Sequence, residues 1–147
     1  GMSSLSCRWI MIAALTGAVG VALGAFAAHG LPDRLSALGY QGSDLDRRLD
    51  IFQTATRYQL VHALALGWVA TLLDRAPVRF WQAAAWAFLL GIVVFSGSLY
   101  VLTIVRPAYN WIGAIVPVGG MTLILGWIFL AAGAFVGRQS LHFSSSH

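Results

Sequence analysis

Long apolar runs alternate with short polar connections along this chain. Four runs, at 9–29, 55–73, 81–105 and 111–136, contain a single charged residue, Arg57. A helix needs about 20 mainly apolar residues to cross a hydrocarbon core of about 30 Å. The pattern therefore predicts an all-α membrane protein with four transmembrane helices within 9–136.

The second run is the least regular of the four. It becomes continuously apolar only from Ala63, because Tyr58, Gln59 and His62 lie in its first turns. Polar side chains are tolerated near the end of a span, where they reach the interface or bond to neighbouring helices. We therefore expect this run to cross the membrane as well.

The connections between the runs are unequal in length. The longest begins with a helix stop and a turn at Gly30 to Asp33, and its later part, 43–54, is amphipathic. That part is either a surface helix that bends into the second run or the start of one continuous helix from Ser43 to Leu73. The later connections are short, which predicts antiparallel neighbours in an up-down-up-down bundle.

The two ends of the chain are interpreted as tails. Residues 1–8 are expected to be an N-terminal tail that starts with Gly1, a residue left by cleavage of a tag, and 137–147 a polar tail. The first run also resembles a secretory signal that ends near Ala28. Its length and its Gly20–Gly24 pair, spaced for close helix packing, favour a retained helix.

Composition and charge narrow the class further. Charged residues make up 10% of the chain, against about 25% in soluble domains. All nine basic residues are Arg, which indicates a GC-rich bacterial genome, and they are scattered, which argues against nucleic-acid binding. Cys7 is the only cysteine, so a disulfide framework and a cysteine-based metal site are excluded. No cofactor is expected.

Charge bias gives little guidance on orientation. Arg8, Arg75, Arg79 and Arg138 lie on the side of the termini, and Arg34, Arg47, Arg48, Arg57 and Arg106 lie on the other side. The density of Arg beside the spans in the second connection favours termini in the cytoplasm, and we expect the bacterial inner membrane.

Polar residues of the runs gather at one end of the predicted bundle. Runs one and three end where runs two and four begin, so the following residues converge on one leaflet: His29, Tyr58, Gln59, His62, Ser96, Ser98, Tyr100, Asn110 and Pro117. Several share helix faces through three- and four-residue spacing. Pro117 is expected inside the fourth span, where it would free the carbonyl of Gly113. These nine residues are the candidate ligand-binding set; no catalytic or metal set is assigned.

The same residues carry a family resemblance. It rests on Gly24-Ala25-Phe26-Ala27-Ala28-His29-Gly30, Phe52-x-x-Ala55-x-x-Tyr58-Gln59-x-x-His62, Phe95-Ser96-Gly97-Ser98-Leu99-Tyr100, Pro117-Val118-Gly119-Gly120 and Gly126-Trp127. Over 9–136 the chain resembles the membrane proteins called domain of unknown function 423, although Gly39 to Ser43 looks like an insertion. The resemblance implies four transmembrane helices and bacterial inner-membrane homologues, with no agreed activity.

Three functions fit these observations. In the first, the polar set only joins the helices, and the protein is a non-enzymatic accessory or scaffold that self-associates or binds other membrane proteins. In the second, the set lines a pocket or path for a small molecule, lipid or ion, with His62 as the best candidate. In the third, His29 and His62 ligate haem or a metal in a redox protein. The first is preferred, because no acidic residue lies inside any run and two His form an incomplete metal site.

Overall fold

The computed structural model describes residues 1–105 and 107–144, with the side chains of Pro107 and 138–144 left out, and these residues are almost entirely helical. The elements are α1 (Ser4–His29), α2 (Leu31–Ala37), α3 (Gly42–Arg75), α4 (Arg79–Gly91), the π-helix η1 (Ile92–Ser96), α5 (Gly97–Ile104), the 3-10 helix η2 (Pro107–Ala114) and α6 (Val116–Ser144). The prediction of an all-α chain is confirmed for this part of the protein. Arg106 and the last residues of the predicted tail, 145–147, lie outside the described residues.

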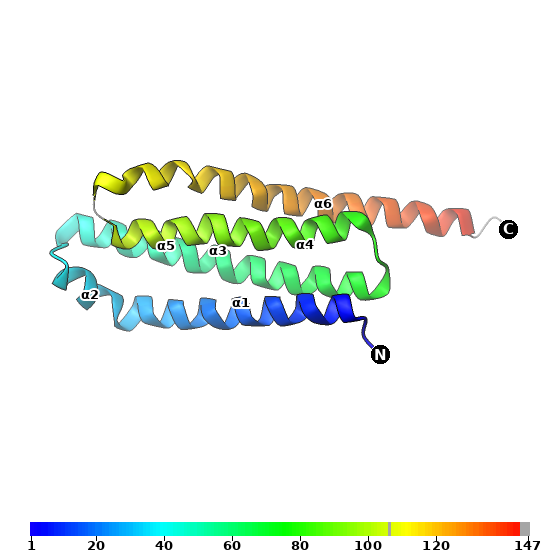
Figure 1. Ribbon diagram of the computed structural model, residues 1–147, viewed down its shortest axis with the longest axis horizontal. Coiled ribbons are helices and arrows are strands. Elements are labelled where there is room, and N and C mark those ends of the chain that lie inside the picture. The colour runs from blue at the N-terminus through cyan, green and yellow to red at the C-terminus, as the bar shows by residue number, and fades with distance from the viewer. Residues whose placement is uncertain (106, 145–147) are drawn as a thin grey trace.

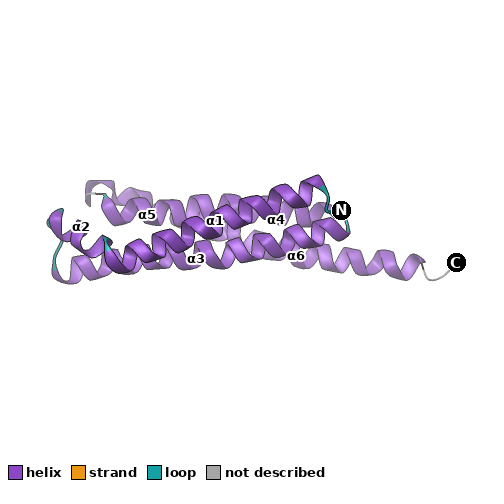
Figure 2. Cartoon of the chain, turned by 90° about the horizontal axis from the view of Figure 1, so that it is seen from below, coloured by secondary structure: helices purple, strands orange, loops and turns teal. Residues whose placement is uncertain are grey.

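The long helices lie side by side in an elongated molecule (Figure 1). In this view α1 and α6 form the two edges, and α3 and the rod made by α4, η1 and α5 lie between them. Consecutive long segments run in opposite directions, so α2 and η2 lie at one end and both chain ends lie at the other (Figures 1 and 2). The polar set therefore belongs to the end of the molecule away from the termini.

Within the described part of the chain, three helical segments are long and apolar enough to cross a membrane: Ser4–His29, Arg79–Ile104 and Ala108–Gly137. The first two have 26 residues each, or about 39 Å at 1.5 Å per residue, which exceeds a core of about 30 Å. Among the described residues α3 does not meet the same criterion of length and hydropathy. Its crossing of the membrane stays a prediction.

The long connection is more helical than its sequence indicated. Of the two alternatives for 43–54, the structure has the continuous helix, because α3 runs unbroken from Gly42 to Arg75. A further short helix, α2, occupies the segment where only a turn was expected, and Pro32 lies in its first turn, where a missing N–H is harmless. The apolar face of 43–54 lies against the protein itself: Leu45 and Leu49 pack on a small core made by α1, α2 and Phe52.

Aromatic side chains of the α4–η1 rod pack against glycines of α6. The rings of Trp81 and Phe88 lie against Gly133 and Gly126, and the backbone of Phe95 lies against Gly119. The aromatic residues and the glycines both recur every seven residues, in opposite chain directions. This is the repeat of an antiparallel coiled coil, and we call this contact between the rod and α6 the seam. Because the Trp81 ring covers Gly133, this glycine contacts the protein's own rod and is not available to a second molecule.

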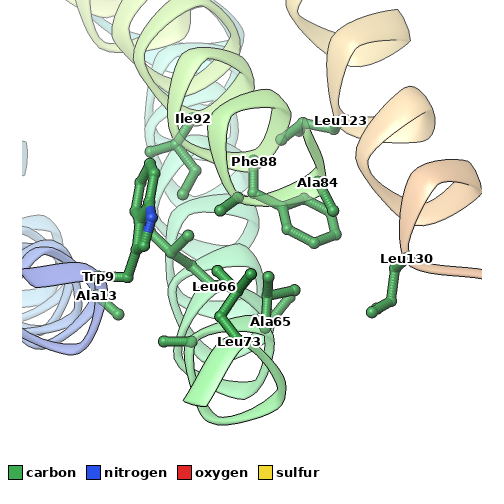
Figure 3. Packing of buried hydrophobic residues seen from close by; sticks show 13 residues of the cluster. Trp9, Ala13, Ala65, Leu66, Leu73, Ala84, Phe88, Ile92, Leu123 and Leu130 are labelled. Atoms are coloured by element: carbon green, nitrogen blue, oxygen red, sulfur yellow. The ribbon is translucent and has the colours of Figure 1, made fainter. Parts of the chain in front are cut away.

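The main core lies beside this seam. Figure 3 shows Phe88 between the α6 residue Leu123 and the α3 residue Leu66, with Trp9 and Ala13 of α1 on the far side. Phe88 and Leu66 are fully buried. The core also includes Ile92 of η1, so it fixes α3 and η1, and these two elements carry Tyr58, Gln59, His62 and Ser96 of the candidate site.

Candidate functional site

The structure brings together six of the nine predicted site residues. They lie on facing sides of α3 and of the η1–α5 segment, and they are Tyr58, Gln59, His62, Ser96, Ser98 and Tyr100. α3 and η1 contribute side chains to the main core, and Tyr100 of α5 packs on the smaller core around Phe52. Their hydrogen-bond partners decide what this set can do.

Gln59 joins three helices through its side-chain amide. Its Nε2 donates to the carbonyl of Thr16 in α1 at 2.9 Å, and its Oε1 accepts from the Tyr100 hydroxyl of α5 at 2.6 Å. The Tyr100 ring lies 4.9 Å from the Phe52 ring, which holds the hydroxyl in position. Gln59 is buried, so both ends of its amide are occupied away from water.

His62 is also bonded on both sides of its ring. Nδ1 lies 2.7 Å from the Tyr58 carbonyl, and Nε2 lies 3.1 Å from Nε1 of Trp127. A carbonyl only accepts and an indole N–H only donates, so Nδ1 carries the proton and Nε2 accepts. The imidazole is neutral in this arrangement, and neither nitrogen is free for a metal. Trp127 belongs to the family pattern, but the sequence does not predict that it donates to His62, because 65 residues separate the two.

The two serines serve the backbone. Ser96 is buried, and its hydroxyl donates to the Ala55 carbonyl of α3 at 2.8 Å. Ser98 donates to the carbonyls of Val94 and Phe95, at 2.6 and 3.0 Å, inside the π-helix. The wider π turn disturbs the regular ladder of backbone bonds, and a hydroxyl can satisfy the carbonyls that it affects. Ser98 thus stabilises the π turn of the rod, and Ser96 joins that turn to α3.

Three predicted residues lie apart from this set. His29 is exposed at the last residue of α1, and Asn110 is exposed in η2. Ala27 of α1 packs in one cluster with Phe52 of α3. Phe52 precedes His62 by ten residues, so His29, two residues after Ala27, lies about 15 Å from His62 along the helix axis. The two imidazoles therefore cannot ligate one haem iron or metal ion. Within the described residues no three His, Cys, Asp or Glu side chains gather as a metal site.

Pro117 has a different role from the one expected. The fourth run is not one helix: it begins as the 3-10 helix η2, and α6 starts only at Val116. Pro117 is exposed in the first turn of α6. A backbone N–H at this position would have no partner inside the helix, so a proline costs nothing there. The expectation that it opens the backbone inside a continuous helix is wrong, since the chain already changes helix type at Ile115, whose N–H bonds the Ile112 carbonyl.

Arg48 is a buried charged residue that does not belong to the predicted site set. Its side chain is only 2% exposed, and its Nη1 donates to the carbonyls of Leu102, Thr103 and Val105 at 3.3, 2.8 and 3.1 Å. The guanidinium lies 3.6 Å from the centre of the Tyr40 ring, and its Nε reaches Asp44 at 3.3 Å. It thus caps the C-terminal end of α5 with positive charge.

The comparison with known proteins places the chain in a family. It matches the protein family of unknown function DUF423 over residues 23–120. The chain belongs to the DUF423 family. That range includes all nine predicted site residues, whereas Thr16 and Trp127, two partners in the polar network, lie outside it.

Relatives of this DUF423 protein are membrane proteins by name. It is 39% identical over 132 residues to a UPF0382 membrane protein of Haemophilus influenzae, covering 90% of this chain and 97% of the relative. It is 36% identical over 127 residues to one of Bacillus subtilis, covering 86% and 94%. No solved structure matches the chain. The protein is therefore an integral membrane protein of a family whose function is unknown.

Proposed function

We propose that this DUF423 protein is a non-enzymatic accessory or scaffold component of the bacterial inner membrane, with four spans and cytoplasmic termini. The observation that carries the proposal is the internal use of the polar set. Gln59, His62 and Ser96 bond to groups of the protein itself, and together they link α3 to α1, α5, α6 and η1.

A catalytic or ligand-binding group must offer a free donor, acceptor or lone pair to its target. Gln59 uses both ends of its amide, and His62 uses both ring nitrogens. Bonds of this kind between membrane helices contribute about 0.6 kcal/mol each on average. The set supports helix assembly more directly than it supports a pocket or a reaction.

The surface of α3 supports the proposal that this helix, which contains the second apolar run, also crosses the membrane. Gln59 and His62 are buried, while Val61, Leu64 and Trp68 are exposed on the outward side of the same helix stretch. An apolar outward face with polar groups turned inward is the arrangement that a lipid environment requires. Polar residues lower the mean hydropathy of α3, although lipid would not contact these buried groups.

The outer side of α1 offers the surface for a partner. Only a few residues of this long helix are buried, and most of them lie against α3. A groove of about 670 Å³ runs between the two helices, and small residues such as Ala14, Ala18 and Gly67 line it. Small side chains allow close approach of another membrane helix. We place a second copy or another membrane protein here.

Native mass spectrometry of the full chain, released from a mild detergent or nanodisc, tests this proposal. The expected particle is larger than one chain of 15.8 kDa and has a fixed stoichiometry. Ala18→Trp in the groove should reduce it to a single chain, whereas Met121→Trp, an exposed α6 position outside that groove, should leave it intact. A single chain in every preparation, or equal effects of the two variants, would overturn the proposal.

A further inference from the structure

Arg57 is the one charged residue in the four apolar runs, and it has no partner in the described protein. Its side chain is exposed on α3, and no hydrogen bond or ion pair joins it to another described residue. Arg48 and Arg47, nearby on the same helix, both pair with Asp44. A charge within a membrane span that lacks an internal partner needs one from outside the chain.

The position of Arg57 along the bundle sets where that partner lies. α4 begins at Arg79, on the side of the termini. Ser96 lies about 25 Å from Arg79 along the rod. Its hydroxyl bonds the Ala55 carbonyl, so Ala55 of α3 lies at the level of Ser96. Arg57, two residues beyond Ala55 in the antiparallel helix, is thus about 22 Å from the Arg79 level. In a core of about 30 Å, about 8 Å remains to the opposite boundary. A long Arg side chain can extend toward headgroups over such a distance.

An apolar groove begins at Arg57. It lies between α3 and α6 and has a volume of about 470 Å³. Its walls are apolar or aromatic apart from Arg57, Tyr58 and His62, and include Val61, Phe95, Leu123, Ile124 and Trp127. Ligand sites in proteins commonly have volumes of about 300–1,000 Å³. The groove therefore combines one cationic end with an apolar body.

We propose that this groove binds an anionic glycerophospholipid, with its phosphate on Arg57 and one acyl chain between α3 and α6. Charge complementarity selects this occupant. A guanidinium forms paired hydrogen bonds with phosphate oxygens, and the exposed Tyr58 beside it offers a further O–H donor. The apolar walls match an acyl chain and disfavour a small hydrated anion.

The proposed lipid site borders the polar network that joins the helices, because His62 and Trp127 belong to both. Trp127 contributes its indole N–H to His62, and its ring lines the groove. The lipid would therefore cover the His62–Trp127 bond from the membrane side and fill the space between two helices that this bond joins. This inference goes beyond the scaffold proposal, because a single chain could bind the lipid.

Native mass spectrometry with added lipids of identical acyl chains tests the site. The probes are phosphatidylglycerol, zwitterionic phosphatidylcholine and diacylglycerol, which lacks phosphate. The full chain should retain one phosphatidylglycerol in preference to the other two. Arg57→Gln should weaken its binding about fivefold, the effect of about 1 kcal/mol per Arg near an anionic surface, and Arg57→Lys should keep most of it. Arg47→Gln, which removes the same charge from an exposed site on the same helix, is the control.

A second pair of variants tests the apolar part. Ile124→Trp fills the groove and should abolish retention, whereas Leu125→Trp, exposed but outside the groove, should not. Val61→Trp replaces the first variant if that one lowers the melting temperature. Equal binding of all three lipids, equal binding by Arg57→Gln and the wild type, or unchanged binding after the groove is filled would overturn the proposal. These results are independent of the number of chains in the particle.

Discussion

The Phe88 ring occupies the space that a side chain at position 126 would need: a Cβ on Gly126 would lie 2.6 Å from both Cδ1 and Cε1 of Phe88. Seven residues away on one side the Trp81 ring lies against Gly133 in the same way, and on the other side the backbone of Phe95 lies against Gly119. Glycines thus let α6 approach the rod closely, and aromatic rings fill the space beside Gly126 and Gly133.

Replacement of Gly126 by Ala should destabilise the protein by about 1–3 kcal/mol, the range for overpacking of a core. The clash is with a side chain, so Phe88→Leu in the same chain should restore part of the loss. Gly24→Ala is the control, because a Cβ at Gly24 meets nothing within 4 Å. Thermal unfolding in detergent, followed by circular dichroism, measures all four proteins.

Gly119 should behave differently from Gly126. A Cβ at 119 would meet the backbone nitrogen and Cα of Phe95. Backbone cannot be trimmed by mutation, so Gly119→Ala should destabilise the protein and Phe95→Leu should not rescue it. If the two glycines respond equally to their rescue mutations, the packing inferred along this seam is incorrect.

The sequence predicts the helical class and the convergence of Gln59, His62, Ser96 and Tyr100, because both depend on local periodicity and on which helix ends meet. It does not predict that Arg48 is buried. An i,i+4 pair with Asp44 looks like a solvated surface, and only the tertiary fold brings the end of α5 beside it. Gly119, Gly126 and Gly133 recur every seven residues, but spacing alone cannot tell an internal neighbour from a second molecule.

The Gln59–Tyr100 bond should be measurable as a coupling between helices. Tyr100→Phe removes the hydroxyl that donates to Gln59 at 2.6 Å, and Gln59→Leu removes the acceptor. The double-mutant cycle should give a coupling of about 0.6 kcal/mol, up to about 1.7. Reversible unfolding of the two single variants, the double variant and the wild type supplies the four free energies. Strictly additive effects would argue that the bond does not form in the membrane.

The tautomer of His62 is a direct consequence of its two partners. Nitrogen-15 NMR of histidine-labelled protein should show a neutral ring with the proton on Nδ1, because the Tyr58 carbonyl accepts and the Trp127 indole donates. Trp127→Phe removes the donor to Nε2 and should shift the Nε2 resonance alone. His29, exposed at the end of α1, gives an internal reference. A proton found on Nε2 would contradict the assigned geometry.

Loss of the Arg48 cap should destabilise the end of the molecule away from the termini. Arg48→Met leaves the carbonyls of Thr103 and Val105 without a charged donor, and hydrogen bonds to charged groups contribute about 1.5–3 kcal/mol. Arg48→Lys should recover only part of this, because a lysine lacks the planar group that stacks on Tyr40. Arg47→Met, at an exposed neighbour, should change the free energy of unfolding by less than about 0.5 kcal/mol. Similar losses for Arg47 and Arg48 would show that charge alone matters there.

Asp44 should make stability depend on acid pH. The hydrogen bond from Arg47, aided by Arg48, holds the pKa of its carboxyl below the ordinary value of 3.8. Because the folded pKa is the lower one, the unfolded chain binds the proton more readily at acid pH. The stabilisation is therefore complete above the unfolded pKa and is lost as the pH falls through the folded one.

Melting temperatures of the wild type should fall over that interval, and those of Asp44→Asn should fall less. Asp50→Asn removes the same charge from the same helix and serves as the control. Parallel pH profiles for the wild type and Asp44→Asn would show that the ion pairs with Arg47 and Arg48 do not contribute to folding.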